Sequence, residues 1–245
     1  MIVHRIADFL SGNLMRRTLL FVSLPLIWFF YFGTLAIVGW LSPVGYDWRR
    51  KAISKLLYPR NNPEFHSIAS VGIAIAGLLM IPFAGYIRRR LRYVSPIATD
   101  IGAFAFGAGA ICLSLAALIV SHPYRGNDTF PRLHEILARS SAFALGVGML
   151  VLWMCALKAY LNPPEGKTLW TGRLLVTWSL LILPTIPISL LRLVADTRVG
   201  WPSPIFRALK DPRIWHLGLW EWIGSWAVFL FLFSSALLLP EQPNG

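Results

Sequence analysis

Six long apolar segments constrain the fold of this 245-residue chain more than any other feature. A helix that crosses a bilayer needs about 20 mainly apolar residues. Segments of this length extend over residues 19–41, 67–87, 97–120, 136–157, 174–194 and 219–239. Since a helix satisfies its own backbone hydrogen bonds in lipid, we predict an all-α polytopic membrane protein, a six-transmembrane-helix bundle. The loops are too short for a separate soluble domain, so residues 1–245 are expected to form a single integral membrane domain.

The composition fits this class and argues against a nucleic-acid-binding function. Hydrophobic residues make up 56% of the chain and charged residues 14%, whereas an ordinary soluble domain has roughly 25% charged residues. The formal net charge is +12, but the basic residues lie between the apolar segments rather than on one polar face. We therefore expect membrane lipids, and no nucleic acid, as partners.

The basic residues of the loops also predict an orientation, because short cytoplasmic loops are enriched in Lys and Arg. Arg88, Arg89, Arg90 and Arg92 fill almost the whole second loop. This dense run favours a cytoplasmic location for both termini, in a multi-pass protein of a bacterial inner membrane, although the other side holds 13 of the 23 basic residues. We predict that the run anchors anionic lipid at the cytoplasmic face.

Small residues one helical turn apart predict where the spans approach closely, because apolar side chains gain little by leaving lipid for one another. Such pairs are Gly72 and Ala76 in the second span, Ala103 and Gly107 with Ala105 and Gly109 in the third, and Ala142 and Gly146 with Ala144 and Gly148 in the fourth. They predict close contact between spans two to four. Pro184 and Pro187 lack backbone donors, so the fifth span is expected to be bent or broken.

Four of the five histidines fall on one side of the predicted bundle, at His66, His122, His134 and His216. Three of them follow a proline just before an even-numbered span, which is compatible with three related helical hairpins. Three imidazoles and a carboxylate can bind Zn²⁺, so the candidate metal ligands are His66, His134 and His216. The candidate catalytic residues for acid–base chemistry on this side are His134, Glu135, Arg139 and Glu221.

The same residues also have a structural interpretation. Proline is favoured at a helix start, acidic residues are favoured near helix N-termini, and Glu135 and Arg139 have the spacing of an ion pair on one helix face. No HExxH or comparable ligand pair is present. The candidate ligands are 68 and 82 residues apart, so their spacing does not predict contact.

Several short motifs resemble the DRAM-like superfamily of six-span membrane proteins, which includes autophagy modulators, GPI-anchor remodelling proteins and uncharacterised prokaryotic members. They are Ala52-Ile53-Ser54-Lys55-Leu56-Leu57 followed by Pro63-Glu64, a second span ending in a basic run, Leu133-His134 and Glu221-Trp222. Lys55 stands where the family pattern has an acid. The resemblance implies a six-helix bundle with the first loop packed over its outer face, and it implies no particular reaction.

Three functions remain open at this point. The first is a lipid-associated or structural membrane protein without enzymatic activity, which the absence of a catalytic motif favours. The second is a metal-dependent lipid hydrolase or transferase with a His/Glu site outside the cytoplasm. The third is a small-solute transporter, in which Pro184 and Pro187 break the fifth span.

Overall fold

The computed structural model describes residues 11–43, 45–120, 129–162, 168–196 and 216–240. In these ranges the chain is helical and contains no strand. The first span consists of α2 (Arg16–Thr18), η1 (Leu19–Ser23), α3 (Leu24–Trp28), η2 (Phe29–Gly33) and α4 (Thr34–Leu41). It is followed by α5 (Ser54–Leu57), α6 (His66–Leu91), α7 (Pro96–Val120), α8 (Thr129–Leu161), α9 (Thr168–Asp196) and α11 (Leu217–Leu238).

Among the described residues, five helical segments are long and apolar enough to cross a membrane, and they match five of the six predicted spans. They are Arg16–Leu41, His66–Leu91, Pro96–Val120, Arg132–Leu161 and Gly218–Leu238. The predicted fifth span, residues 174–194, lies within α9, which continues from Thr168 to Asp196 without a break. The all-α, multi-pass membrane fold is therefore confirmed. Of the two expectations for the fifth span, the break at Pro184 and Pro187 does not occur, and the bend stays a prediction.

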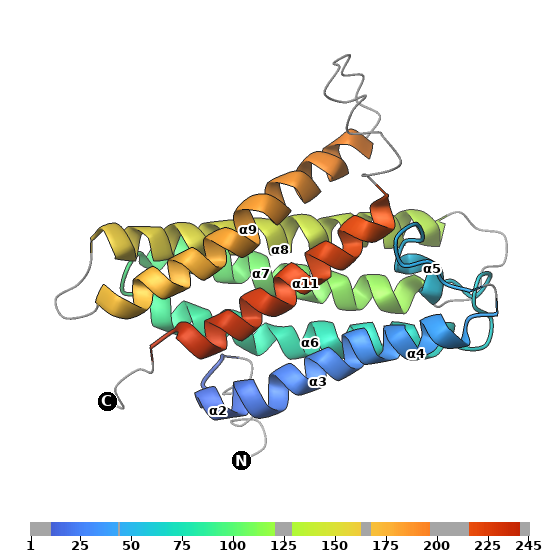
Figure 1. The fold of residues 1–245 in the computed structure, drawn as a ribbon, viewed down its shortest axis with the longest axis horizontal. Helices are drawn as coiled ribbons and strands as arrows, with labels where there is room; N and C mark the ends of the chain where they lie inside the picture. Colours follow the sequence, from blue (N-terminus) through green and yellow to red (C-terminus); the bar gives the residue numbers. More distant parts are fainter. Residues whose placement is uncertain (1–10, 44, 121–128, 163–167, 197–215, 241–245) are drawn as a thin grey trace.

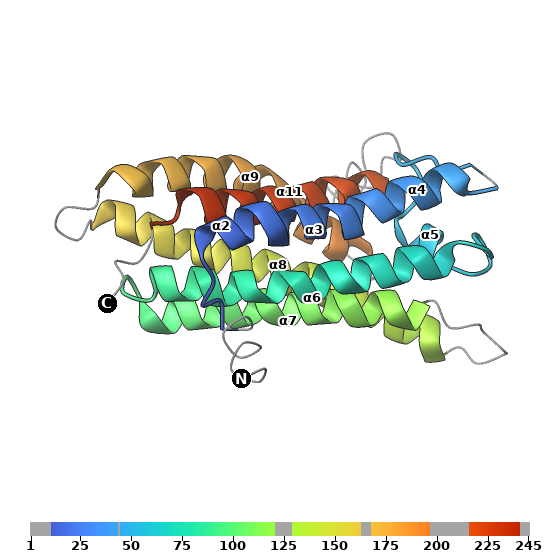
Figure 2. The same cartoon turned by 90° about the horizontal axis from the view of Figure 1, so that it is seen from below.

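The helices run alternately up and down along one direction, as Figures 1 and 2 show. α7 packs against both α6 and α8, α8 packs against α9, and α9 packs against α11. The helices from α6 to α11 thus pack one against the next in chain order. The first span contacts both α6 and α11, the two ends of this series. Large apolar side chains such as Phe21, Phe104 and Leu180 remain more than 70% exposed, as expected for side chains that face lipid.

The first span is irregular around Pro25 and Tyr31. Pro25 has no backbone N–H to donate, and the wide π-helical turn η1 directly precedes the helix in which it lies. In η2, the N–H of Thr34 bonds to the carbonyl of Phe29, five residues back. The Thr34 hydroxyl donates to the carbonyl of Phe30 at 2.5 Å, so a side chain satisfies a backbone acceptor at this distortion.

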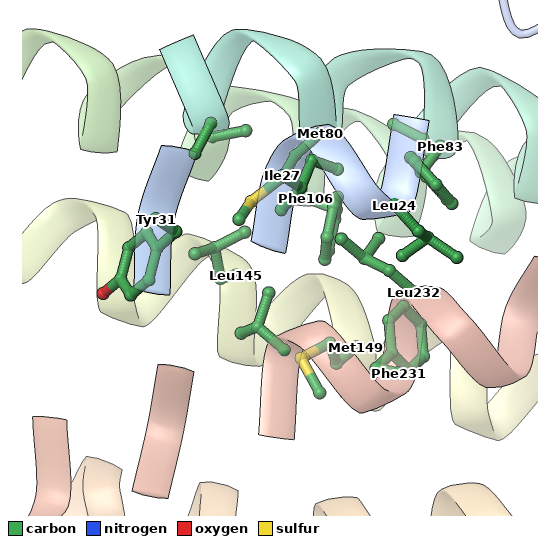
Figure 3. Packing of buried hydrophobic residues seen from close by; sticks show 14 of the residues in the cluster. Leu24, Ile27, Tyr31, Met80, Phe83, Phe106, Leu145, Met149, Phe231 and Leu232 are labelled. Atoms are coloured by element: carbon green, nitrogen blue, oxygen red, sulfur yellow. The ribbon is translucent and has the colours of Figure 1, made fainter. Parts of the chain in front are cut away.

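The interior of the bundle is filled by apolar side chains from the first span and from α5, α6, α7, α8, α9 and α11. Leu24 and Ile27 of α3 meet Phe83 of α6, Phe106 of α7 and Phe231 of α11 in the region drawn in Figure 3. Each of these five side chains is at most 2% exposed. This packing gives the transporter hypothesis no support, because that hypothesis requires a polar cavity at this depth.

Close helix contacts occur at three of the predicted small residues. A Cβ atom on Gly72 would lie 2.4 Å from the Thr34 hydroxyl, and one on Gly109 would lie 2.7 Å from the backbone nitrogen of Leu145. A Cβ atom on Gly148 would lie 2.7 Å from the backbone nitrogen of Phe106. The prediction that small residues bring spans together is confirmed for the third and fourth spans, whereas Gly72 of the second span faces the first span. The second span approaches the third at Gly77, where a Cβ atom would lie 2.8 Å from the Ala110 carbonyl oxygen.

We expect the substitution Gly148→Ala to lower the free energy of unfolding by about 1–3 kcal/mol, because the added methyl meets the backbone of α7. Gly224→Ala is the matched control: its Cβ would have no neighbour within 4 Å, and alanine favours the helix. Thermal unfolding of both variants in the same detergent measures the difference. Equal melting temperatures for the two variants would contradict the inferred contact between α7 and α8.

Candidate functional site

The two ends of the bundle carry different polar residues, and we name them by their position. The α5 end contains residues 42–65, the start of α6, α8 and α11, and the end of α7. The arginine end contains Arg16, Arg17 and the run from Arg88 to Arg92, with the start of α7 and the end of α11. α5 and α2 mark these opposite ends in Figure 1.

At the α5 end, the first loop docks on the start of α11 through Glu221. The Glu221 Oε2 atom accepts a hydrogen bond from the backbone N–H of Ile53 at 2.5 Å. One turn earlier, Gly218 lies so close to the loop that a Cβ atom there would be 2.3 Å from the Lys51 carbonyl oxygen. A small residue and a carboxylate on one helix face therefore hold the loop by its backbone.

Tyr46 and Trp222 form a second connection between the loop and α11. The Tyr46 hydroxyl donates to the Lys51 carbonyl at 2.9 Å, and the indole N–H of Trp222 donates to the Tyr46 hydroxyl at 3.3 Å. Burial raises the pKa of Tyr46 to about 12, and the nearby carboxylates of Glu221 and Asp47 add to this rise. The phenol therefore stays protonated at neutral pH and remains a donor to the loop.

Tyr31 joins this site from the first span. Its hydroxyl lies 2.6 Å from the Ser225 hydroxyl, and Ser225 lies 2.7 Å from the Glu221 carbonyl, to which it donates. Since the Ser225 proton is used for that carbonyl, Tyr31 is the donor to Ser225. Phe32 stacks on Trp226 with ring centroids 4.3 Å apart.

We call Tyr31, Tyr46, Glu221, Trp222 and Ser225 the Glu221 cluster. Its hydroxyl groups are engaged as donors within the protein, and Ser225 donates to a backbone carbonyl rather than to a basic side chain. Nucleophilic catalysis requires a base next to the nucleophile, and the described contacts of Ser225 provide none. The arrangement is suited to positioning the loop and to accepting hydrogen bonds.

The candidate metal ligands lie in separate local environments at the α5 end. His66 Nδ1 lies 3.1 Å from the carbonyls of Asn62 and Pro63. His134 Nδ1 lies 2.9 Å from the Ala116 carbonyl, and the imidazole meets the Tyr58 ring edge-on. His216 is the residue that precedes α11. Within the described ranges, no three His, Cys, Asp or Glu side chains form a group that could hold a metal ion.

The other candidate catalytic residues do not join the Glu221 cluster through any described hydrogen bond or ion pair. Glu135 and Arg139 form an ion pair along α8, as their spacing predicts, and both side chains are more than a third exposed. His134 is 9% exposed and bonds to α7. His122 lies outside the described residues. Of the four candidates, Glu221 is the one that the structure places in a cluster drawn from distant parts of the chain.

At the arginine end, every member of the predicted lipid-binding run has a partner within the protein. Arg88 forms two hydrogen bonds with Asp100, at 2.7 and 3.1 Å, and Arg92 lies 3.7 Å from the same carboxylate. Arg89 donates to the carbonyl and hydroxyl of Ser11. Arg90 is buried, with its guanidinium 3.4 Å from the centre of the Tyr86 ring and its Nε donating to the Pro240 carbonyl.

Sequence reasoning did not identify Arg16, which connects the two ends of the chain. Its guanidinium donates to the carbonyls of Ala236, Leu237 and Leu239 at 2.6–2.9 Å. The last carbonyls of a helix have no intrahelical donor, and a cation near a helix C-terminus is favoured by the helix dipole. Arg16 stands beside Arg17 directly before an apolar segment, and this pattern alone does not distinguish a helix-capping residue from a lipid-facing one.

No protein-family model, curated protein or solved structure matches the chain. The site is therefore interpreted from its own geometry.

We expect Arg16→Ala to lower the free energy of unfolding by about 1.5–3 kcal/mol, the range for hydrogen bonds that involve a charged group. Arg17→Ala is the control, since the Arg17 side chain is exposed and its loss should cost less than about 0.5 kcal/mol. The measurement is thermal unfolding in detergent. Equal losses in the two variants would show that Arg16 does not cap α11.

We expect Glu221→Ala to release the first loop, because the Ile53 N–H loses its acceptor. Trypsin should then cleave after Arg49, Arg50 or Lys51 about five- to thirtyfold faster, which corresponds to a loss of 1–2 kcal/mol. Glu221→Gln keeps an acceptor oxygen and should be cleaved at the wild-type rate. Limited proteolysis followed by mass spectrometry measures the rates, and fast cleavage of both variants would contradict this role of the carboxylate oxygen.

Proposed function

We propose that this multi-pass membrane protein is lipid-associated and non-enzymatic, and that its arginine end binds the phosphate groups of anionic lipids at the cytoplasmic face. The observation that carries the proposal is the exposure of Arg88 and Arg92, whose side chains are 44% and 58% exposed and share one carboxylate, Asp100. Two guanidinium groups beside a single acid leave a positive charge at the level of the headgroups. Such charges attract anionic lipid by about 1 kcal/mol per basic residue.

The distribution of charge over the described residues supports the same orientation. The arginine end has eight basic residues and one acid, namely Arg16, Arg17, Arg88, Arg89, Arg90, Arg92, Lys158, Arg173 and Asp100. The α5 end has eight basic residues and five acids, namely Arg49, Arg50, Lys51, Lys55, Arg60, Arg132, Arg139, Arg192, Asp47, Glu64, Glu135, Asp196 and Glu221. The two ends have equal numbers of basic residues, but Arg88, Arg89, Arg90 and Arg92 fall within five residues beside one short loop. This density favours the cytoplasm for the arginine end. The localisation of the protein in the inner membrane of a bacterium stays a prediction.

The described contacts favour a non-enzymatic role over the two alternatives. A hydrolase or transferase would need its candidate residues to meet, and His134, Glu135 and Arg139 bond to groups other than Glu221. A transporter would need a polar pathway. The described core consists mainly of apolar side chains, and buried hydroxyl groups such as those of Ser114 and Ser141 donate to helix carbonyls. The resemblance to the DRAM-like superfamily stays a prediction.

The double variant Arg88→Gln/Arg92→Gln tests the lipid proposal. We expect it to retain phosphatidylglycerol or cardiolipin about ten- to thirtyfold less well than the wild type, because two charges near the membrane surface are lost. Arg49→Gln/Arg50→Gln removes two exposed charges from the α5 end and should change retention little. Native mass spectrometry of protein released from mixed-lipid micelles gives the bound fraction. Equal retention by the wild type and both double variants would overturn the proposal.

A further inference from the structure

We propose that the Glu221 cluster binds a primary ammonium group, such as the headgroup amine of an aminophospholipid, at the end of the bundle opposite the arginine run. The inference extends the proposed lipid association to a second headgroup chemistry. It can fail separately, because it depends on Glu221 and not on Arg88 or Arg92.

The charge of Glu221 is the first argument. Asp100 has Arg88 and Arg92 as partners, and Glu135 has Arg139. Glu221 lies in the membrane-spanning segment Gly218–Leu238, and its Oε2 atom accepts from a neutral backbone N–H. Among the described residues, no cationic side chain forms an ion pair with it. Ionised residues in spans are costly unless they face a partner or water, so an external cation fits this position.

The second argument is that the cluster has used its own donors. Tyr31 donates to Ser225, Ser225 to the Glu221 carbonyl, and Tyr46 to the Lys51 carbonyl. The Trp222 N–H donates to Tyr46. What the cluster still offers is acceptor capacity, above all Glu221 Oε1, to which no described residue donates. Such a site suits a ligand with several N–H donors and disfavours a phosphate, which has only acceptors and negative charge.

The third argument is the location of the cluster and its aromatic surroundings. Glu221 is the fifth residue of α11 and is partly exposed, so its carboxylate lies close to the end of the helix, at the level of the membrane–water interface, where headgroups lie. Trp222 is the next residue of α11, and Trp226, one turn further along the helix, is 43% exposed. Trp is enriched at this level of the membrane, so these residues agree with an interfacial position of the cluster.

The test uses the full-length protein in micelles that contain equal amounts of phosphatidylethanolamine, phosphatidylcholine and phosphatidylglycerol. Native mass spectrometry then measures which lipids remain bound to the wild type and to two variants, Glu221→Gln and Glu64→Gln. Glu221→Gln removes the charge but keeps an acceptor for the Ile53 N–H, so the loop stays docked. Glu64→Gln is the matched control, because Glu64 is an exposed acid at the same end.

We expect the wild type to prefer phosphatidylethanolamine over phosphatidylcholine, whose headgroup nitrogen has no N–H. In Glu221→Gln, the ratio of bound phosphatidylethanolamine to bound phosphatidylcholine should fall about fivefold, the size expected for the loss of an ion pair at a partly exposed site. In Glu64→Gln this ratio should equal that of the wild type. Displacement of the lipid by millimolar free ethanolamine would show that the ammonium group alone is sufficient. Retention against ethanolamine would show that the site recognises the amine as part of a lipid.

Two results would overturn the proposal. One is a wild-type protein with no preference for phosphatidylethanolamine, which needs no variant and does not depend on folding. The other is an unchanged preference in Glu221→Gln. A loss of phosphatidylglycerol with preserved phosphatidylethanolamine in Arg88→Gln/Arg92→Gln would leave this proposal intact and would support the arginine-end site independently.

Discussion

In a bilayer, every backbone donor and acceptor must find a partner within the protein, because lipid offers none. The helices meet this constraint along their length, and the structure shows how it is met where regular geometry fails. The Thr34 hydroxyl bonds to a carbonyl at the π-helical turn of the first span. Arg16 bonds to three carbonyls at the end of α11, and Glu221 accepts the N–H of Ile53 at its start. Polar side chains near the ends of α11 thus connect it to the first span and the first loop.

These connections explain why the two ends of the bundle differ in chemistry. At the arginine end, guanidinium groups bond to carbonyls and to Asp100, and enough of them stay exposed to interact with anionic headgroups. At the α5 end, a carboxylate and three hydroxyl groups meet around a docked loop, and their protons are used within the protein. The arginine end therefore presents donors with positive charge, and the Glu221 cluster at the other end presents acceptors around a carboxylate. This difference is the physical basis of the two lipid proposals.

Individual residues show how far the sequence could be interpreted. Gly72, Gly109 and Gly148 were predicted at close helix contacts because small residues recur one turn apart, and this local pattern is sufficient. Glu135 and Arg139 were predicted to pair from their spacing on one helix. Glu221 was among the candidate site residues, but its partners Ile53, Tyr46 and Tyr31 were not. They come from segments 168 to 190 residues away along the chain, and no local pattern connects them.

By itself, the sequence determined that this chain is a helical, multi-pass membrane protein, because apolar length sets the number and extent of spanning helices and needs no information on how they pack. It also determined which short motifs bring neighbouring helices together. Only the tertiary structure decided which polar residues meet: that Arg16 caps the last helix, that Arg90 is buried against Tyr86, and that Glu221 holds the first loop. Such contacts depend on the rotation of each helix about its axis and on its neighbours in the bundle, which are properties of the packed whole.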